Sequence, residues 1–254
     1  MTAPLFYVDP ADLADADALD EVIVSGEEGR HAVSVRRLEP GEFVQVSDGN
    51  GRIVTGPVLR TEGKDSLVVA VQQVTTVPVP TPTVTVALAL IKGERMERAV
   101  ESLAEIGVDT IVVWQAEHCV VRWDRKDHSK AMQRLVKKAQ QASKLARRSH
   151  LCRIERLTTL DGLVERINQG AHGVVLHEGE GPALAETDLS GEELFIVIGP
   201  EGGLTETEIE RLVQSGAVQA RMGSTVMRAG TAATAAAAVV MSRTQRWSPS
   251  NHLA

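Results

Sequence analysis

Residues 195–205 read FIVIGPEGGLT, and this stretch decides the fold class of the chain. Its first four residues are apolar, which predicts a buried strand, and a turn of glycine and proline follows directly. Thr205 and Glu208 have the spacing of a capping box, which predicts that a helix begins after the turn. A buried strand that leads through a tight turn into a helix is typical of an α/β fold with a parallel sheet.

The turn is also a candidate ligand site. Glycines after a strand allow a ligand to approach the backbone, and ligands of open α/β sheets bind beyond the carboxyl ends of the strands. Glu201 at the tip would project a carboxylate toward such a ligand. The pattern is not GxGxxG and no Walker-type lysine follows, which disfavours dinucleotide and P-loop sites. A structural turn with a solvated glutamate remains the alternative.

A second stretch with the same order of elements, MGSTVMRAGTAA, occupies residues 222–233. A strand again ends in glycine, and a short loop leads to a helix that begins near Thr231. Arg228 stands among apolar neighbours, so it either extends to solvent or is held in a site for an anion or polar substrate. The alanine run up to Val240 indicates either simple helix propensity or a helix packed closely against another backbone.

Three prolines at alternate positions in residues 78–82 mark a change in the pattern of the chain. Before them we expect short strands broken by turns over residues 1–74, with residues 75–82 as a linker. After them strands and helices alternate, which predicts an α/β domain over residues 83–248. The expected strands are 83–91, 110–114, 173–176, 194–198 and 218–222, and the expected helices are 94–106, 129–148, 160–167, 205–214 and 230–246.

Composition favours a cytoplasmic protein. The start, MTAPLFYVDPADLADADALD, lacks the order of a signal peptide, and no apolar run reaches the roughly 20 residues that span a bilayer. The two cysteines, Cys119 and Cys152, cannot supply a disulfide framework. His118 and Cys119 are adjacent but lack two further ligands, so we expect neither a membrane nor a metal ion as a partner.

Charge is distributed unevenly along the chain. The net charge is −7, yet residues 122–156 carry twelve lysines and arginines against three acidic residues. A basic segment on an acidic protein is typical of a surface that binds phosphate, although a solvated helix face would give the same pattern.

The two C-terminal stretches, in this order and spacing, resemble the signature of the SPOUT methyltransferases. Four further stretches resemble the RsmE-type enzymes of that class, the 16S rRNA uracil-N3 methyltransferases; they are HAVSVRR (31–37), DGNG (48–51), KGERM (92–96) and AEIGV (104–108). The resemblance covers nearly the whole chain. It implies a C-terminal SPOUT α/β trefoil-knot domain, whose last segment is threaded through a loop, and a small N-terminal PUA-like RNA-binding β-barrel.

The resemblance also implies a site. The cofactor would be S-adenosyl-L-methionine (SAM), the substrate a uridine of 16S rRNA or of the small ribosomal subunit, and a homodimer would complete the pocket. Arg228 would stabilise the uracil anion, and Glu201 would act as base or position the ring. For His177, which follows a strand, a structural role is the stronger alternative. The implied cofactor-binding residues are Leu176, His177, Ile198, Gly199, Pro200, Glu201, Gly202, Gly203, Met222, Gly223, Val226, Met227, Thr231 and Ala232. The implied RNA-binding residues are His31, Arg36, Arg37, Lys92, Arg95, Arg147 and Arg148.

The chain departs from the family pattern at four positions. The family usually carries a glutamate at Gly230, a Glu-Gln pair at Lys144 and Leu145, and a lysine at Ser102. These departures keep open a non-catalytic RNA-binding protein, which a cofactor titration would distinguish. A SPOUT enzyme that methylates ribose 2′-hydroxyls is the other alternative, which product analysis would distinguish.

Overall fold

The structure, a computed structural model, describes residues 3–123, 125–179 and 181–248, so residue 124 of the basic segment lies outside it. The chain divides into two compact units. The N-terminal unit comprises Met1–Val79 with Arg147–Leu151, and the C-terminal unit comprises Pro80–Ala146 with Cys152–Ala254. The chain therefore passes between the units at three places.

The N-terminal unit is built mainly on short strands, as the sequence predicts. Its elements are β1 (Leu5–Tyr7), α1 (Pro10–Leu13), β2 (Glu21–Val24), α2 (Gly26–Arg30), the π-helical turn η1 (His31–Val35), β3 (Phe43–Ser47), β4 (Arg52–Glu62), β5 (Ser66–Ala70) and β6 (Gln73–Thr76). The strands are hydrogen-bonded in the order β1-β3-β4-β5-β2, and β6 pairs with β4. The expectation of strands and turns is wrong for residues 26–35. Acidic residues in the first turn favour a helix there, and His31–Val35 continue it as the π-helical turn.

Residues 147–151 complete the N-terminal unit from a distant part of the chain. The hydroxyl of Tyr7 donates a hydrogen bond of 2.6 Å to the carbonyl of Arg148, and burial raises the pKa of that hydroxyl. The amide of Gly51 donates to the carbonyl of Ser149 at 3.0 Å. Gly51 is the last residue of the predicted DGNG turn, and its φ of +105° is a left-handed conformation that favours glycine.

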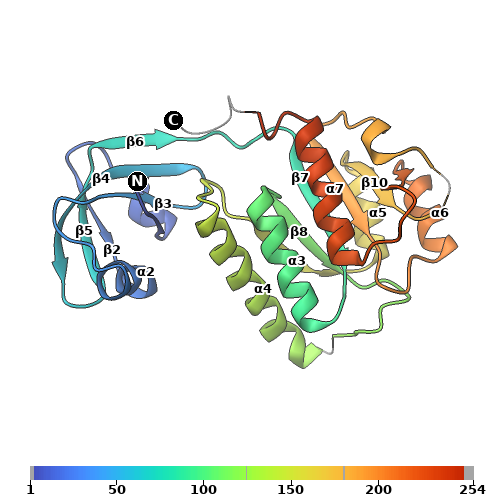
Figure 1. Ribbon diagram of the computed structural model, residues 1–254, viewed down its shortest axis with the longest axis horizontal. Helices are drawn as coiled ribbons and strands as arrows, with labels where there is room; N and C mark the ends of the chain where they lie inside the picture. The colour runs from blue at the N-terminus through green and yellow to red at the C-terminus, as the bar shows by residue number, and fades with distance from the viewer. Residues whose placement is uncertain (1–2, 124, 180, 249–254) are drawn as a thin grey trace. The chain divides into compact units, whose positions relative to one another are not determined.

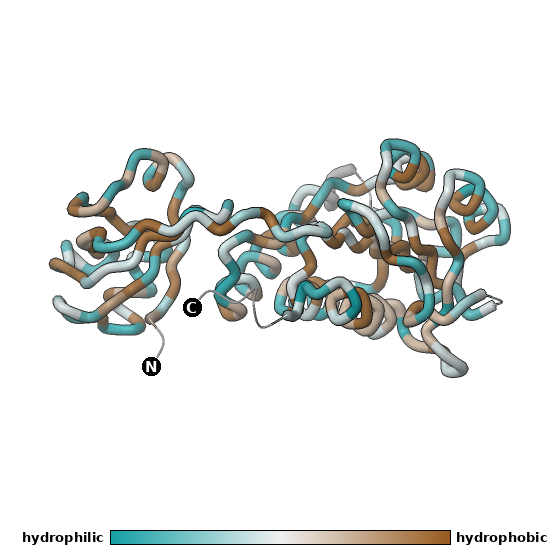
Figure 2. Tube along the Cα trace, turned by 90° about the horizontal axis from the view of Figure 1, so that it is seen from above, coloured by the Kyte–Doolittle hydropathy of each residue, from teal (hydrophilic) through white to brown (hydrophobic). Residues whose placement is uncertain are grey.

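The C-terminal unit is an α/β structure, as predicted. Its elements are β7 (Thr83–Ala89), α3 (Gly93–Ile106), β8 (Thr110–Trp114), α4 (Arg125–Leu145), β9 (Arg153–Thr158), α5 (Leu160–Asn168), β10 (His172–Leu176), the 3-10 turn η2 (Leu184–Glu186), β11 (Glu193–Ile198), α6 (Glu206–Gln214), β12 (Val218–Ala220) and α7 (Ala229–Arg243). Within the described residues six parallel strands lie in the order β12-β10-β11-β7-β8-β9. Figure 1 shows α3, α4 and α7 on one face of this sheet and α5 and α6 on the other. Because both faces are covered, the central strands β7, β8 and β11 are buried along most of their length, and Figure 2 shows hydrophobic residues in brown in the interior of this unit.

The structure differs from the prediction at one strand and at one helix boundary. The sequence does not predict β9, whose residues RIERLT are mostly polar and only partly buried. The capping box of Thr205 and Glu208 starts α6, as expected. The basic helix is predicted to reach residue 148, but α4 ends at Leu145. Arg147 has a left-handed φ of +54°, which a right-handed helix cannot contain, so Arg147 and Arg148 do not belong to the basic helix.

Helix α7 packs closely against α3, which supports the second interpretation of the alanine run. Ala233, Ala236 and Ala237 on α7 are fully buried. A Cβ added to Gly230 would come within 3.3 Å of the Cβ of Ala99 on α3. The glutamate that the family usually carries at this position would therefore press on α3 in this chain.

A buried ion pair fixes the segment that follows α7. The guanidinium of Arg246 donates to both carboxylate oxygens of Asp109, at 2.7 and 3.0 Å, and to the carbonyl of Pro82 at 2.6 Å. Only 7% of the Arg246 side chain and 16% of the Asp109 side chain are exposed. Asp109 also accepts a hydrogen bond from the amide of Val84, so its charge is well compensated. The segment directly after α7 is thereby tied to the beginning of β7.

Candidate active site

Three neighbouring strands bring the predicted cofactor segments to one edge of the sheet. Strand β10 lies between β11 and β12, and its last residue, Leu176, pairs with Ile198 on one side and Ala220 on the other. Because the strands are parallel, the chain leaves all three at the same edge, where ligands of open α/β sheets bind. The segments that follow them, here called the carboxyl-edge loops, are residues 177–179, 199–204 and 222–228.

Two glycines leave open space beside the backbone of these loops. A Cβ added to Gly203 or Gly223 would meet no heavy atom within 4 Å, and the two residues have φ of +76° and +146°. A ligand can therefore approach the backbone at both positions. At Gly199 and Gly202, by contrast, other side chains occupy this space. An added Cβ would lie 2.9 Å from the side chain of Leu204 at Gly199 and 2.9 Å from that of His118 at Gly202.

Glu201 lies at the tip of the second loop, beside the first turn of α3. Its carboxylate is 3.4 Å from Nη1 of Arg95, and Lys92, the N-cap of the same helix, is exposed. A Cβ on Gly230, in the first turn of α7, would lie 3.8 Å from the carbonyl oxygen of Arg95. The first turns of α3 and α7 therefore meet near the loop that carries Glu201.

Arg228 is the residue from which α7 begins. It is the N-cap of the helix, and its carbonyl accepts a hydrogen bond from the amide of Ala232 at 2.8 Å. Its side chain is exposed and makes no hydrogen bond or ion pair with any residue that the structure describes. Val226 beside it is 79% exposed. Apolar shielding of Arg228 is therefore not supplied within a single chain.

His177 shapes the first of the three loops. Its Nδ1 accepts a hydrogen bond from the amide of Gly179 at 3.0 Å. Its own amide donates to the carbonyl of Ala220 at 3.0 Å, which links the loop to β12. These contacts support the structural alternative for His177.

The last residue of β8 and the segment after it also reach the carboxyl-edge loops, which the sequence does not predict. The indole N–H of Trp114 donates to the carbonyl of Ile198 at 3.1 Å. Nδ1 of His118 lies 3.1 Å from the carbonyl oxygen of Gly202. The sequence singles out His118 only as a weak metal ligand, because nothing local to it indicates a partner some eighty positions away.

The predicted RNA-binding residues of the N-terminal unit differ in their surroundings. Arg36 and Arg37 are exposed directly after the π-helical turn. The ring of His31 is half-buried and packs 6.3 Å from that of a buried phenylalanine. Arg147, which belongs to this unit, donates to the carbonyl of Ala3 at 3.2 Å. Arg36 and Arg37 are thus the side chains best placed to meet phosphate.

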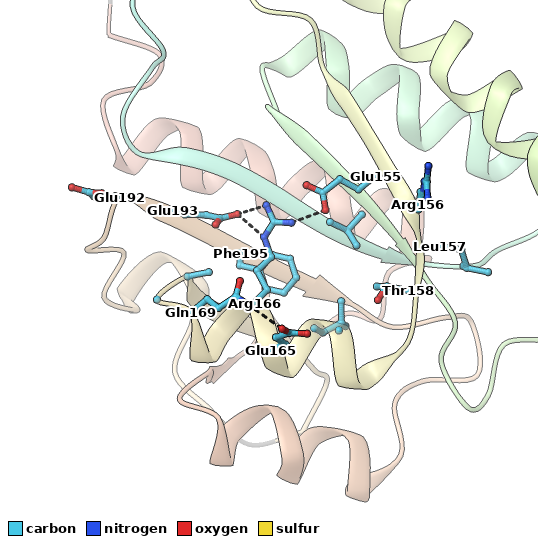
Figure 3. Close-up of a pocket in the computed structure, with 15 residues that line it drawn as sticks. Glu155, Arg156, Leu157, Thr158, Glu165, Arg166, Gln169, Glu192, Glu193 and Phe195 are labelled. Atoms are coloured by element: carbon cyan, nitrogen blue, oxygen red, sulfur yellow. Dashed lines mark hydrogen bonds and ion pairs between the residues drawn. The ribbon is translucent and has the colours of Figure 1, made fainter.

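A separate pocket of about 830 Å³ lies on the face of the sheet that α5 covers. Figure 3 shows the guanidinium of Arg166 between the carboxylates of Glu155 and Glu193. Nη1 is 2.7 Å from Glu155 and Nε is 2.9 Å from Glu193, and the group lies 5.4 Å from the centre of the Phe195 ring. None of the lining residues belongs to the carboxyl-edge loops. This pocket is therefore distinct from the candidate active site.

Known families match both parts of the chain. Residues 78–241 match the family described as RNA methyltransferase domain, and residues 24–72 match that described as RNA methyltransferase PUA domain. The ribosomal RNA small subunit methyltransferase E of Mycobacterium bovis is 37% identical over 98% of this chain and 95% of its own length. The protein of the same name from Bacillus subtilis is 29% identical over 82% of this chain and 85% of its own.

Solved structures share the fold across both units. A protein from Legionella pneumophila, described as a methyltransferase and solved with the bound cofactor SAM, matches with a TM-score of 0.83 and 25% identity, over 96% of this chain and 98% of that one. The ribosomal RNA small subunit methyltransferase E of Neisseria gonorrhoeae, bound to S-adenosyl methionine, matches with a TM-score of 0.81 and 20% identity, over 95% and 98%. The second likeness concerns the fold alone.

Proposed function

Because the chain belongs to the RNA methyltransferase family, with 37% identity to a ribosomal RNA small subunit methyltransferase E, we propose that it methylates N3 of a specific uridine in 16S rRNA, with SAM as methyl donor. The observation that carries the proposal is the meeting of three loops at one edge of the parallel sheet. Glu201 and Arg228 lie on two of these loops. The family match indicates the class of reaction, and the loops offer a place for it.

The finer architecture belongs to the same proposal. We propose that the N-terminal unit, Met1–Val79 with Arg147–Leu151, is a PUA-like β-barrel and extends beyond the predicted residues 1–74. The predicted linker, residues 75–82, begins within β6 and ends at the junction of the units, and the C-terminal unit would hold the SPOUT trefoil-knot domain predicted for residues 83–248. The family matches and the burial of α7 against α3 support this assignment. A homodimer would cover the exposed Val226 and supply the apolar surroundings that Arg228 lacks in a single chain.

The carboxyl-edge loops fit SAM through open backbone. Gly203 and Gly223 leave room for a ligand, and loops of this kind bind an adenine through amide and carbonyl groups. When bound, SAM supplies a methyl group that its sulfonium has already activated. The residues of the chain therefore need to hold the cofactor, orient the uracil and manage one proton.

Methylation at N3 of uridine requires one residue to accept the N3 proton and another to stabilise the resulting anion. N3 is protonated at neutral pH, so a base must accept its proton as the methyl group arrives. We assign that role, or the positioning of the ring, to Glu201, which Arg95 orients from 3.4 Å. Arg228, whose guanidinium is exposed, would stabilise the developing uracil anion. Since N3 lies on the pairing edge, the uridine must be unpaired or extruded.

Arg36→Gln and Arg37→Gln are each expected to weaken RNA affinity and to reduce the salt dependence of binding by about one phosphate contact. Both side chains are exposed, so the fold and SAM affinity should not change. Fluorescence anisotropy with a small-subunit rRNA fragment at several salt concentrations measures the slope. Arg147→Gln is a useful comparison, because it also removes the contact with Ala3. A wild-type slope in both Arg36 and Arg37 variants would show that these side chains are only solvated.

Methyl transfer to purified small subunits tests the proposed reaction. Nucleoside mass spectrometry should find 3-methyluridine, and base-resolved mapping should place it at one position, with no effect of a chelator. A 2′-O-methylated product would instead support the ribose methyltransferase. Failure to bind SAM in a calorimetric titration would support the non-catalytic RNA-binding protein.

The proposed substrate also sets the expected location. Among the described residues, no helix has the length and apolar character needed to cross a membrane. We propose a cytoplasmic enzyme, because the small ribosomal subunit is its expected partner.

A further inference from the structure

The last residue of β8 and the segment after it, residues 114–118, hold the loop at 199–204 at its start and in its middle. The indole N–H of the fully buried Trp114 donates to the carbonyl of Ile198, the last residue before the loop, at 3.1 Å. The imidazole of His118 lies 3.1 Å, through Nδ1, from the carbonyl oxygen of Gly202. Because a carbonyl only accepts hydrogen bonds, Nδ1 must carry the proton in this contact.

A third contact holds the end of the same loop. Glu208 is 5% exposed, and one of its carboxylate oxygens accepts from the amide of Glu117 at 2.9 Å. The other oxygen accepts from the amide of Thr205, also at 2.9 Å. The capping box of α6 is thus joined to the segment after β8. The loop is fixed at its start, middle and end by residues within five positions of one another.

The fit between Gly202 and His118 is close enough to require glycine. A Cβ on Gly202 would lie 2.9 Å from the Cβ of His118 and 3.1 Å from its carbonyl oxygen. Cys119 stabilises the turn, since its Sγ accepts from the amide of Ala116 at 3.3 Å, and burial raises the pKa of its thiol. In the described part of the chain no three His, Cys, Asp or Glu side chains gather to hold a metal ion. His118 and Cys119 both take part in hydrogen bonds of this turn.

We propose that His118 is a positioning residue for SAM, which fixes the carbonyl of Gly202 and thereby the loop that carries Glu201 and Gly203. The proposal rests on the proposed function, in which the backbone of this loop holds the cofactor. A group that orders a binding loop before the ligand arrives reduces the entropy lost on binding. On this proposal His118 acts on the reaction through the loop, by way of its contact with Gly202.

Three variants test this role by calorimetric titration with SAM and by steady-state methylation of small subunits. His118→Ala is expected to weaken SAM affinity about two- to tenfold, the worth of one hydrogen bond, and to raise KM for SAM more than it lowers kcat. His118→Asn should restore most of the affinity, because the asparagine amide can donate from a similar position. His172→Ala is the matched control. It removes a ring-to-carbonyl contact of 2.9 Å, with Asp188, away from the loop and should bind SAM as the wild type does.

Gly202→Ala disturbs the same contact from the other side and should also weaken SAM affinity, with thermal unfolding showing that both variants remain folded. Wild-type SAM affinity in His118→Ala and in Gly202→Ala would overturn the role of His118. So would an equal loss in His118→Ala and His172→Ala, which would indicate general destabilisation. Failure of the wild-type protein to bind SAM would instead overturn the proposed function.

Discussion

Arg228→Ala is expected to lower the single-turnover rate of methyl transfer about a hundredfold to a thousandfold, with SAM affinity nearly unchanged. The guanidinium makes no hydrogen bond or ion pair with the described residues, and the cap of the helix that begins at Arg228 uses only its backbone. Truncation should therefore leave the fold intact and remove stabilisation of the uracil anion in the transition state alone. A rapid-quench assay with purified small subunits and saturating SAM measures the rate.

A rise in pH should partly rescue Arg228→Ala, because solvent then removes the N3 proton before the methyl group is transferred. Arg228→Lys should recover little, since a point charge does not reproduce a planar fork of donors. Arg98→Ala, which removes an exposed arginine of α3, is the control and should react at the wild-type rate. A wild-type rate in Arg228→Ala, or lost SAM binding without rescue by pH, would assign Arg228 to structure.

Arg246→Ala is expected to lower the free energy of unfolding by about 3 to 5 kcal/mol, because it leaves the carboxylate of Asp109 buried without its counter-charge. Urea denaturation followed by circular dichroism measures the change. Arg211→Ala is the matched control. It breaks an equally short pair with Asp161, at 2.6 Å, whose side chains are 44% and 80% exposed. That loss should not exceed about 1 kcal/mol.

The ion pair of Arg246 and Asp109 leads to a second expected result, for a variant in which both residues are replaced. Replacing Asp109 and Arg246 together by apolar residues of similar volume should cost less than Arg246→Ala alone, because no buried charge is then left uncompensated. A small loss in Arg246→Ala, similar to that in Arg211→Ala, would show that other contacts hold the segment after α7.

Most elements of the C-terminal unit could be predicted because their signals are local. The edge strand β9 (RIERLT) could not, because its residues are mostly polar and only partly buried. The apolar strand and capping box around Thr205 place β11 and α6 almost where the structure has them. The family motifs likewise identified the loops that meet at the sheet edge. The contact of His118 with Gly202 could not be predicted, because it joins residues far apart in sequence and depends on the order of strands in the sheet.

The sequence also predicts that α4 continues to residue 148, whereas the helix ends at Leu145 because of contacts with distant residues. Residues 146–148 read as a continuation of a basic helix, since Ala and Arg both favour helices. The turn at Arg147 is set by distant partners instead, among them Tyr7 and Gly51, which bind the next residues of the chain. These tertiary contacts override the local helix propensity, and the periodicity of the sequence does not reveal them.

The return of residues 147–151 to the N-terminal unit affects how this unit folds during synthesis. A ribosome releases residues 1–79 early, but the N-terminal body lacks its last five residues until nearly twice as much chain has emerged. Until then the hydroxyl of Tyr7 and the amide of Gly51 lack the carbonyl groups that accept from them in the complete fold, and water takes their place. A gene fragment that ends at the proline-rich stretch therefore encodes an incomplete body, and this body could not be exchanged between proteins as a single contiguous cassette.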